Sequence, residues 1–425
     1  MLTGLGAPAE LGAQAGLDAG LARADSILQQ ATAEERVPGA VLLVSRDGRM
    51  VHERAFGFAR LYDADGTRLS EPEPMTPDHV FDLASVTKVM ATTFAVMLLV
   101  DRGTLDLDAP VGQYLPAFEG GAKDRVTLRH LLTHGGGLPQ WVPVYFHARD
   151  RAEAEAYVAR HPLAFPVGEE RRYSDLGFML LGYVVERVSG RRLDRFVEEE
   201  LYAPLGLAST AFLPREKGLG PSAATSHGNP YERRMVEDDE FGYRVEVDPR
   251  AFRSWREHTL VGEVNDGNAH YAHGGVAGHA GLFSTARELG VLLDVLLNGG
   301  RYGGRRILKP ETIAEFLRPQ AFGHGLGWML EAGISGGGDA ADAAGGGGGV
   351  DPAASADAAG GAEHVFFHPG FTGTWVAGVP ELGLSIVLLT NRQNVGVDET
   401  GRYPDIDGIR RSIVDEIVKA AKDPG

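Results

Sequence analysis

The chain has 425 residues, of which 43% are hydrophobic, and this is enough to bury a sizeable core and to form two subdomains. It carries 41 basic and 58 acidic residues, a net charge of −17, and has no basic stripe, which argues against nucleic acid and anionic membranes as partners. The absence of cysteine excludes disulfides, cysteine nucleophiles and cysteine-ligated zinc.

The first twenty residues have no positively charged start, no continuous apolar core and no run long enough for a transmembrane helix. As written, the chain is therefore expected to be cytoplasmic, without a transmembrane segment. A sequence truncated at its N-terminus would look the same, and the protein would then be periplasmic or extracellular.

The chain opens with signals for a helix and then a hairpin. Apolar residues at helical spacing between Leu17 and Leu28 predict an amphipathic first helix. Residues 41–45 and 50–56 flank Asp47-Gly48, a two-residue turn signal, and are predicted to be paired strands.

An apolar run from Val89 to Val100 follows Ser85-Val-Thr-Lys88. Because it is hydrophobic nearly all round, it predicts a buried helix that begins near Ser85 and ends at Asp101-Arg102-Gly103, and the run is too short to span a bilayer.

The middle of the chain, to about Arg287, shows helical patterns with irregular connections, whereas strands are predicted again near the C-terminus. These strands are followed by a closing amphipathic helix marked by Ile409, Ile413 and Ile417. The segment 335–361 is almost entirely Gly, Ala, Asp, Ser and Pro, and we expect a disordered loop there. The predicted strands cover residues 325–329, 365–368, 374–379 and 384–390.

This order predicts an α+β fold in which both chain ends share one antiparallel sheet flanked by the terminal helices. The sheet subdomain is expected to comprise residues 1–80 and 285–425. A mainly helical subdomain, residues 81–284, is expected to be inserted between them.

Three short motifs are candidates for chemistry. In Ser85-Val-Thr-Lys88 the serine and lysine are three residues apart, so the amine can reach the hydroxyl, and an amine in a dry pocket loses its charge more easily. The alternative is a helix N-cap with a surface lysine. Tyr173-Ser-Asp175 precedes a second helical run, and His368-Pro-Gly370 lies on a predicted strand. Their alternatives are a second N-cap and a strand bulge.

The three motifs, in this order, resemble the S-x-x-K, Y-x-N and K-T-G motifs of the serine β-lactamase and penicillin-binding protein superfamily. The resemblance covers roughly residues 35–420 and is closest to low-molecular-weight penicillin-binding proteins, class C β-lactamases and related esterases. It extends to three further stretches, residues 131–139, 275–284 and 388–391.

The resemblance implies a β-lactamase/transpeptidase-like fold and an acyl-accepting nucleophile at Ser85. It implies that Lys88 helps to deprotonate the serine and that Tyr173 is the partner base and later acid. The oxyanion hole would be formed by the backbone N–H groups of Ser85 and Phe371.

The chain departs from the motifs at three positions. Asp175 replaces an asparagine, so it cannot donate a hydrogen bond to a substrate carbonyl, but it can pair with Lys88. His368 replaces a lysine and leaves a weaker, pH-dependent positive charge. Pro369 replaces a threonine and removes a hydroxyl and a backbone donor. Asp175, His368 and Gly370 are the expected substrate-binding residues. Because of the three departures, we expect the site to bind a free substrate carboxylate poorly.

We therefore expect a serine hydrolase that acts on a small-molecule or peptide substrate with an acyl group. It would be D-alanyl-D-alanine carboxypeptidase-like or esterase-type, with weak β-lactamase activity. The alternatives are a true class C-type β-lactamase and a non-catalytic penicillin-binding or ligand-sensing module. No cofactor is expected, and the oligomeric state stays open. Four histidines between His258 and His279 lack metal-binding spacing, so no metal site is expected.

Overall fold

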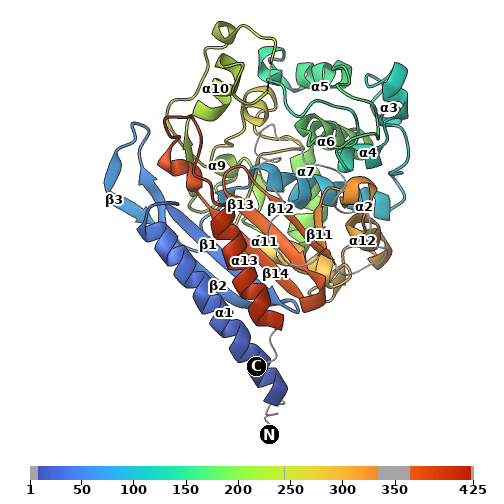
Figure 1. Ribbon diagram of the computed structural model, residues 1–425. Helices are drawn as coiled ribbons and strands as arrows, with labels where there is room; N and C mark the ends of the chain where they lie inside the picture. Colours follow the sequence, from blue (N-terminus) through green and yellow to red (C-terminus); the bar gives the residue numbers. More distant parts are fainter. Residues whose placement is uncertain (1–7, 244, 333–363, 423–425) are drawn as a thin grey trace.

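The computed structural model describes residues 8–243, 245–332 and 364–422, and the segment 335–361 expected to be disordered falls outside them. A seven-stranded antiparallel sheet contains strands from both ends of the chain (Figure 1). In spatial order its strands are β11 (Met329–Ala332), β12 (His364–Pro369), β13 (Thr374–Val379), β14 (Leu384–Thr390), β1 (Gly39–Arg46), β2 (Arg49–Tyr62) and β3 (Arg68–Pro74).

The predicted β1–β2 hairpin is confirmed, with the two turn residues Asp47 and Gly48 both at positive φ. The predicted β13 and β14 are also confirmed, and β12 is one residue longer at each end. The strand predicted over residues 325–329 was wrong in position, because β11 starts only at Met329, and Gly327 has a φ of +84° in the preceding loop.

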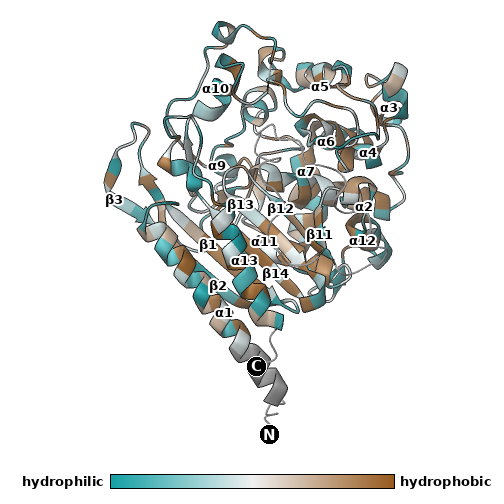
Figure 2. Cartoon of the chain, viewed as in Figure 1, coloured by the Kyte–Doolittle hydropathy of each residue, from teal (hydrophilic) through white to brown (hydrophobic). Residues whose placement is uncertain are grey.

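The terminal helices α1 (Pro8–Ala33) and α13 (Asp407–Lys422) lie side by side on one face of the sheet (Figure 1). Leu28 of α1 and Ile413 of α13 share a buried cluster with Leu42 and Val44 of β1. Figure 2 shows that both helices also carry hydrophilic residues. The amphipathic patterns seen in the sequence thus cover this face of the sheet.

The opposite face of the sheet is covered by α11 (Ala286–Leu297) and, beyond it, by the mainly helical part of the chain. Val41 and Leu43, which alternate with the residues of the first cluster, join the larger core on this side. The helices of this part are α2 (Phe94–Asp101), α3 (Val111–Tyr114), α4 (Leu128–Leu132), α5 (Arg151–Arg160), α6 (Asp175–Ser189), α7 (Leu193–Val197), α8 (Ala203–Leu205), α9 (Pro214–Lys217) and α10 (Pro230–Glu237), with α12 (Pro310–Leu317) following α11.

Three small sheets complete the part of the chain that the structure describes. One is formed by β4 (Phe81–Asp82), β8 (Leu282–Ser284) and β5 (Ala211–Phe212). The others pair β6 (Ala224–His227) with β7 (Thr259–Val261) and β9 (Arg301–Tyr302) with β10 (Arg305–Arg306). The first of them matters for the site, because β4 leads directly into Ser85.

The buried helix predicted from the apolar run is confirmed. It comprises a 3-10 turn (Ala84–Val86), a π-helical segment (Lys88–Thr93) and α2, and its last turn is followed by Gly103 with a φ of +70°. Taken as one helix, Ala84–Asp101 is long and apolar enough to cross a membrane, but 83% of it is buried inside the protein. It is therefore the central helix of the core.

Asn391, at the end of β14, ties three strands together. Its Oδ1 atom accepts from the Gly39 N–H at 2.8 Å, and its Nδ2 atom donates to the carbonyls of Phe58 (3.1 Å) and Ala59 (2.9 Å). The side chain is 1% exposed, so water does not replace these bonds when they are lost.

Asn391→Ala should lower the free energy of unfolding by about 2–4 kcal/mol, because it leaves buried main-chain groups without partners. Urea unfolding followed by circular dichroism measures this change. The exposed Asn298→Ala serves as the control and should stay within about 0.5 kcal/mol of the wild type. Equal stability of the two variants would contradict the structural role of Asn391.

Candidate active site

Ser85 lies on the 3-10 turn that follows β4 and faces a cavity. The preceding residue, Ala84, has a φ of +45°, which is unusual for a residue with a side chain. Its N–H donates to Asp82 Oδ1 at 2.9 Å, and this bond helps to hold the tight turn. The serine hydroxyl is thus presented at the start of the buried helix.

Lys88 is fully buried, and its Nζ atom lies close to oxygen atoms of three residues. It donates to Ser85 Oγ at 2.9 Å and to the His279 carbonyl at 3.3 Å, and it lies 2.7 Å from Asp175 Oδ1. The structure therefore brings together the serine, the lysine and the aspartate that the sequence singled out.

The charge of Lys88 differs from the sequence-based expectation. Burial lowers the pKa of Lys88, but Asp175 and Tyr173 together raise it more, so the pKa lies above its usual value. The expectation that a dry pocket makes the amine lose its charge is corrected: in the resting site Lys88 is an ammonium paired with a carboxylate.

Tyr173 completes this cluster. Its ring lies 4.7 Å from Lys88 Nζ, and its buried hydroxyl makes no hydrogen bond that meets normal geometry within the described part of the chain. Burial raises the pKa of Tyr173, although Lys88 and Ser85 oppose this rise. A neutral phenol close to the serine, with no fixed partner, is able to take part in proton transfer.

His134 holds the Tyr173 segment in place. Its Nδ1 atom accepts from the Ser174 N–H at 3.1 Å, its carbonyl accepts from the Arg172 N–H at 3.1 Å, and its ring lies 4.5 Å from the Tyr173 ring. The Asp175 N–H in turn donates to the Gln140 carbonyl at 3.0 Å. The stretch 131–139, which the sequence indicated without a role, is thus the support of the second motif.

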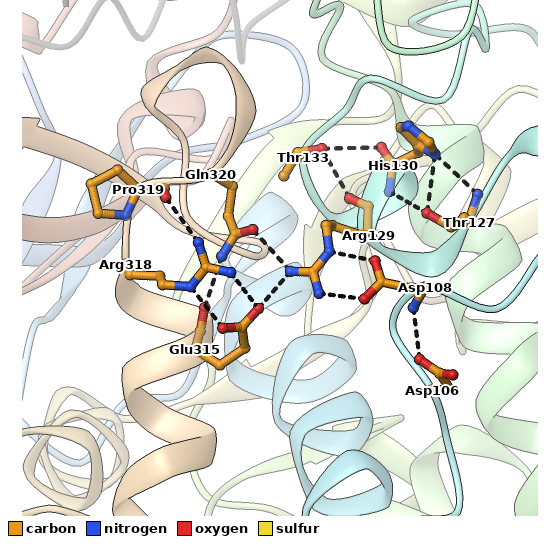
Figure 3. Close-up of polar contacts among 10 residues, drawn as sticks. All are labelled: Asp106, Asp108, Thr127, Arg129, His130, Thr133, Glu315, Arg318, Pro319 and Gln320. Atoms are coloured by element: carbon orange, nitrogen blue, oxygen red, sulfur yellow. Dashed lines mark hydrogen bonds and ion pairs between the residues drawn. The ribbon is translucent and has the colours of Figure 1, made fainter. Parts of the chain in front are cut away.

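Arg129 fixes the helix that leads to His134 (Figure 3). Its guanidinium makes a two-point contact with Asp108 at 2.7 and 2.8 Å and also reaches Glu315 (2.6 Å) and Gln320 (2.9 Å). Because Glu315 belongs to α12, this network connects α4 to a helix from the far end of the chain.

The stretch 275–284 lies against the helix that carries Lys88. Thr92 donates to the Gly278 carbonyl at 2.6 Å, and the Leu282 N–H donates to Thr87 Oγ1 at 3.1 Å. A Cβ atom on Gly278 would lie 2.0 Å from the Phe178 carbonyl oxygen, so only glycine permits this approach to α6.

The third motif lies against the Ser85 turn. A Cβ atom on Gly370 would lie 2.5 Å from the Leu83 carbonyl oxygen, and Thr374 and Thr372 donate to the carbonyls of Leu83 (3.0 Å) and Asp82 (2.7 Å). The glycine therefore marks a close approach of two backbones, as its position in a strand indicated. Phe371, the next residue, lines the cavity together with Ser85.

His368 lies behind this surface. It is fully buried, its Nδ1–H donates to the Pro369 carbonyl at 2.8 Å, and it is absent from the residues that line the cavity. Burial, together with the charge of Lys88, lowers the pKa of His368 to about 3. The expected conditional positive charge is therefore corrected: His368 is neutral across the physiological range.

The cavity beside Ser85 encloses about 740 Å³, including the space at its open mouth. Three carboxylates line it, two of which were not among the expected site residues: Asp175, Glu232 and Asp266. The other lining residues are Ala84, Ser85, Gln140, Trp141, Tyr173, Asn229, Tyr231, Met235, Tyr243, Asn265, Ala280, Phe371 and Tyr403.

Asp266 and Glu232 differ in protonation. Burial raises the pKa of Asp266, but contact with His279 (2.9 Å) and the Ala269 N–H (2.7 Å) lowers it more, to about 2. Burial and the nearby Asp266 raise the pKa of Glu232 to about 8. Near neutral pH the first is therefore ionised and the second is mostly protonated.

Asp175, Asp266 and His279 are the one group of possible metal ligands among the described residues, with donor atoms within 4.8 Å of one another. Asp175 already pairs with the Lys88 ammonium, and Asp266 already pairs with His279. A divalent cation would have to compete with both contacts, so the donor set fits a metal ion poorly.

The raised pKa of Glu232 predicts a pH-dependent stability. Between the unfolded value near 4.5 and the folded value near 8, only the folded state keeps the proton, so stability decreases as the pH rises through this range. In the wild type, the proton that Glu232 keeps only in the folded state should make the free energy of unfolding decrease by up to about 1.4 kcal/mol for each unit of pH rise in this range. Glu232→Gln should abolish this decrease. Urea unfolding at pH 5 and pH 8 measures it. A wild type and variant with the same pH dependence would show that Glu232 does not hold a proton.

Comparison with known proteins agrees with this arrangement. The sequence model of the Beta-lactamase family matches residues 24–409. The chain is 34% identical over 386 residues to the N-acetylmuramyl-L-alanine amidase of Bacillus subtilis, covering 87% of this chain and 80% of the relative. It is 33% identical to a putative D-alanyl-D-alanine carboxypeptidase of Escherichia coli, covering 87% and 82%.

Solved structures show the same fold. A penicillin-binding protein homologue from Caulobacter crescentus superposes with a TM-score of 0.64 at 22% identity, covering 94% of this chain and 97% of the other. The expected β-lactamase/transpeptidase-like fold is thereby confirmed. With the family match extending over most of the sequence, this chain belongs to the β-lactamase family.

Proposed function

We propose that the protein is a serine hydrolase that forms an acyl-enzyme at Ser85. One observation carries the proposal: the buried Lys88 Nζ lies 2.9 Å from Ser85 Oγ and 2.7 Å from Asp175 Oδ1, at the wall of an open cavity. A serine with a positioned amine and a buried phenol beside it is the arrangement that nucleophilic catalysis requires.

In this mechanism the Lys88–Tyr173 pair first loses one proton to solvent, because the resting ammonium and phenol include no free base. Ser85 Oγ then attacks the substrate carbonyl and passes its proton to the pair. The developing oxyanion is stabilised by the N–H groups of Ser85 and Phe371. Tyr173 then protonates the leaving group. A water molecule, deprotonated by the same pair, attacks the acyl-enzyme and releases the acid.

The surroundings of the serine favour ester or amide substrates without a carboxylate beside the scissile bond. His368 is neutral, so it offers no positive charge to a substrate carboxylate, and Asp266 lines the cavity in its ionised form. A substrate carboxylate there would meet like charge in a partly dry site. We therefore favour the esterase-type activity, with weak β-lactamase activity.

A D-alanyl-D-alanine carboxypeptidase is the second candidate, supported by a relative that carries this name at 33% identity. A non-catalytic binding module is disfavoured because Ser85, Lys88 and Tyr173 are all present and adjacent. Turnover of a butyrate ester, a D-Ala-D-Ala peptide and a cephalosporin separates the candidates. Fastest turnover of the cephalosporin would instead indicate a true β-lactamase.

Ser85→Ala should lower kcat/KM for p-nitrophenyl butyrate by about a thousandfold, because it removes the nucleophile. Stopped assays with equal concentrations of folded protein measure this loss. The exposed Ser412→Ala is the matched control and should retain wild-type activity. If Ser85→Ala hydrolyses the ester as fast as the wild type, the acyl-enzyme at Ser85 is ruled out.

Asp175→Asn should move the pH–rate profile to lower pH. Asp175 raises the pKa of both Lys88 and Tyr173, so its removal makes either base lose its proton more easily. In the wild type, kcat/KM should still rise up to pH 10, whereas in the variant it should level off earlier. Profiles from pH 6 to 10, with the exposed Asp239→Asn as control, measure the shift. A profile that stays in place or moves to higher pH would contradict this role of Asp175.

A further inference from the structure

Acidic side chains line the cavity beside Ser85, although Asp175 pairs with Lys88 and Asp266 pairs with His279. The lining residues include Asp175, Glu232 and Asp266 but, within the described part of the chain, no lysine, arginine or histidine. The mechanism above uses only Asp175. The other two carboxylates therefore have no role in the attack on the carbonyl, and they face the space where the rest of a substrate must lie.

The buried cations nearby are already engaged. Lys88 contacts Ser85 and Asp175. Arg256 donates to Asn229 Oδ1 at 3.1 Å and to the carbonyls of Val264 (2.8 Å) and Asn265 (3.0 Å), so it makes its hydrogen bonds to neutral groups. Its charge acts on Glu232 only through space.

Glu232 shows an incomplete set of partners. The residue is 9% exposed, and its Oε2 atom accepts from the Gly267 N–H at 2.9 Å. Its Oε1 atom is buried and accepts no hydrogen bond of normal geometry from the described residues; the equally unpartnered Tyr145 hydroxyl interacts with Glu232 without completing one. A buried carboxyl oxygen without a hydrogen-bond partner is costly, and a donor that enters the cavity can supply that partner.

From these contacts, and on the basis of the acyl-Ser85 function proposed above, we propose that the cavity binds a substrate ammonium group at Glu232 and Asp266. The preferred acyl donors then carry a free amine rather than a carboxylate. This assigns to Glu232 and Asp266 a role in substrate selection, separate from the bond-breaking step.

Aromatic rings complete such a site. Tyr231, Phe371 and Tyr403 line the cavity together with the carboxylates. Their ring centroids lie 5.0 Å apart for Tyr231 and Phe371 and 5.8 Å apart for Phe371 and Tyr403. An aromatic ring next to carboxylates stabilises an organic ammonium because the ring quadrupole attracts a cation, as it already does for the Arg392 guanidinium, which lies 5.5 Å from the centre of the Phe371 ring.

The protonation of Glu232 agrees with this site. Without a cation, burial and Asp266 keep its pKa raised, whereas an ammonium at hydrogen-bond distance would favour the carboxylate. A cation therefore relieves the repulsion between Glu232 and Asp266. A carboxylate ligand would add a further like charge to the same pair.

Competitive inhibition of ester hydrolysis tests the proposal in the wild-type enzyme. The probes are benzylammonium, benzyl alcohol and benzoate, which share one ring and differ in charge. With p-nitrophenyl butyrate as substrate, Ki for benzylammonium should be at least tenfold lower than Ki for benzyl alcohol, and benzoate should inhibit least. A Ki for benzylammonium equal to or above that of the alcohol would overturn the proposal.

Variants then test the assignment to Glu232. Glu232→Gln should reduce the tenfold preference for benzylammonium to less than threefold. The exposed Glu237→Gln, five residues further along α10, should leave the preference unchanged. A preference that persists in Glu232→Gln would overturn the assignment. The wild-type comparison stands even if this buried variant fails to fold.

Matched substrates provide a second measurement. D-Alanyl- and β-alanyl-p-nitroanilide place the amine at two distances from the carbonyl, and each is compared with its N-acetyl derivative. At least one free amine should be cleaved tenfold faster than its acetylated form, and faster cleavage of both acetylated forms would overturn the proposal. If p-nitrophenyl butyrate is not hydrolysed through Ser85, the proposed function itself fails, and this outcome is distinct from loss of the charge preference.

Discussion

The site depends on one buried ion pair, the contact between Lys88 and Asp175. An ammonium that is fully removed from water is strongly unfavourable unless a carboxylate and further acceptors surround it. Asp175 supplies the charge, and Ser85 Oγ and the His279 carbonyl supply the remaining acceptors. These groups come from three separate parts of the chain, so the ion pair forms only when the start of α6 and the stretch 275–284 both lie against the Ser85 helix. The nucleophile is therefore positioned as a consequence of satisfying a buried charge.

The surrounding structure is arranged to keep this contact in place. His134 holds the segment that leads to Asp175, and Arg129 fixes the helix before His134 through a network to α12. Gly278 and Gly370 allow two loops to approach α6 and the Ser85 turn more closely than any side chain would permit. The same dense packing removes water from His368, and it thereby removes the positive charge that the sequence suggested there.

The sequence predicted most of the sheet strands and indicated three short segments that lie together in the structure, because both depend on local patterns. Turn residues bounded β1, β2, β13 and β14, and the apolar run predicted the core helix. The pKa of Lys88 could not be predicted, since it depends on which of two opposing effects, burial or Asp175, is larger.

Glu232 was missed because Arg233 and Arg234 follow it and suggest an exposed helix. A signal was available: Glu232 lies three and four residues before Met235 and Val236, on the face of α10 that the fold buries.

The charges of the groups around the cavity determine which substrates the site can bind well. Discrimination between substrates is a difference of binding free energies, and it arises as much from repulsion of the wrong ligand as from attraction of the right one. Two features act in the same direction here: a neutral His368 offers no positive charge to a carboxylate, and the ionised Asp266 in the cavity wall repels one. Lys88 Nζ contacts Ser85, Asp175 and the His279 carbonyl rather than Glu232 or Asp266, so the groups that we propose to select a ligand are not the ones that hold the nucleophile. Selectivity can therefore change within this fold while the contact between Ser85 and Lys88 stays the same.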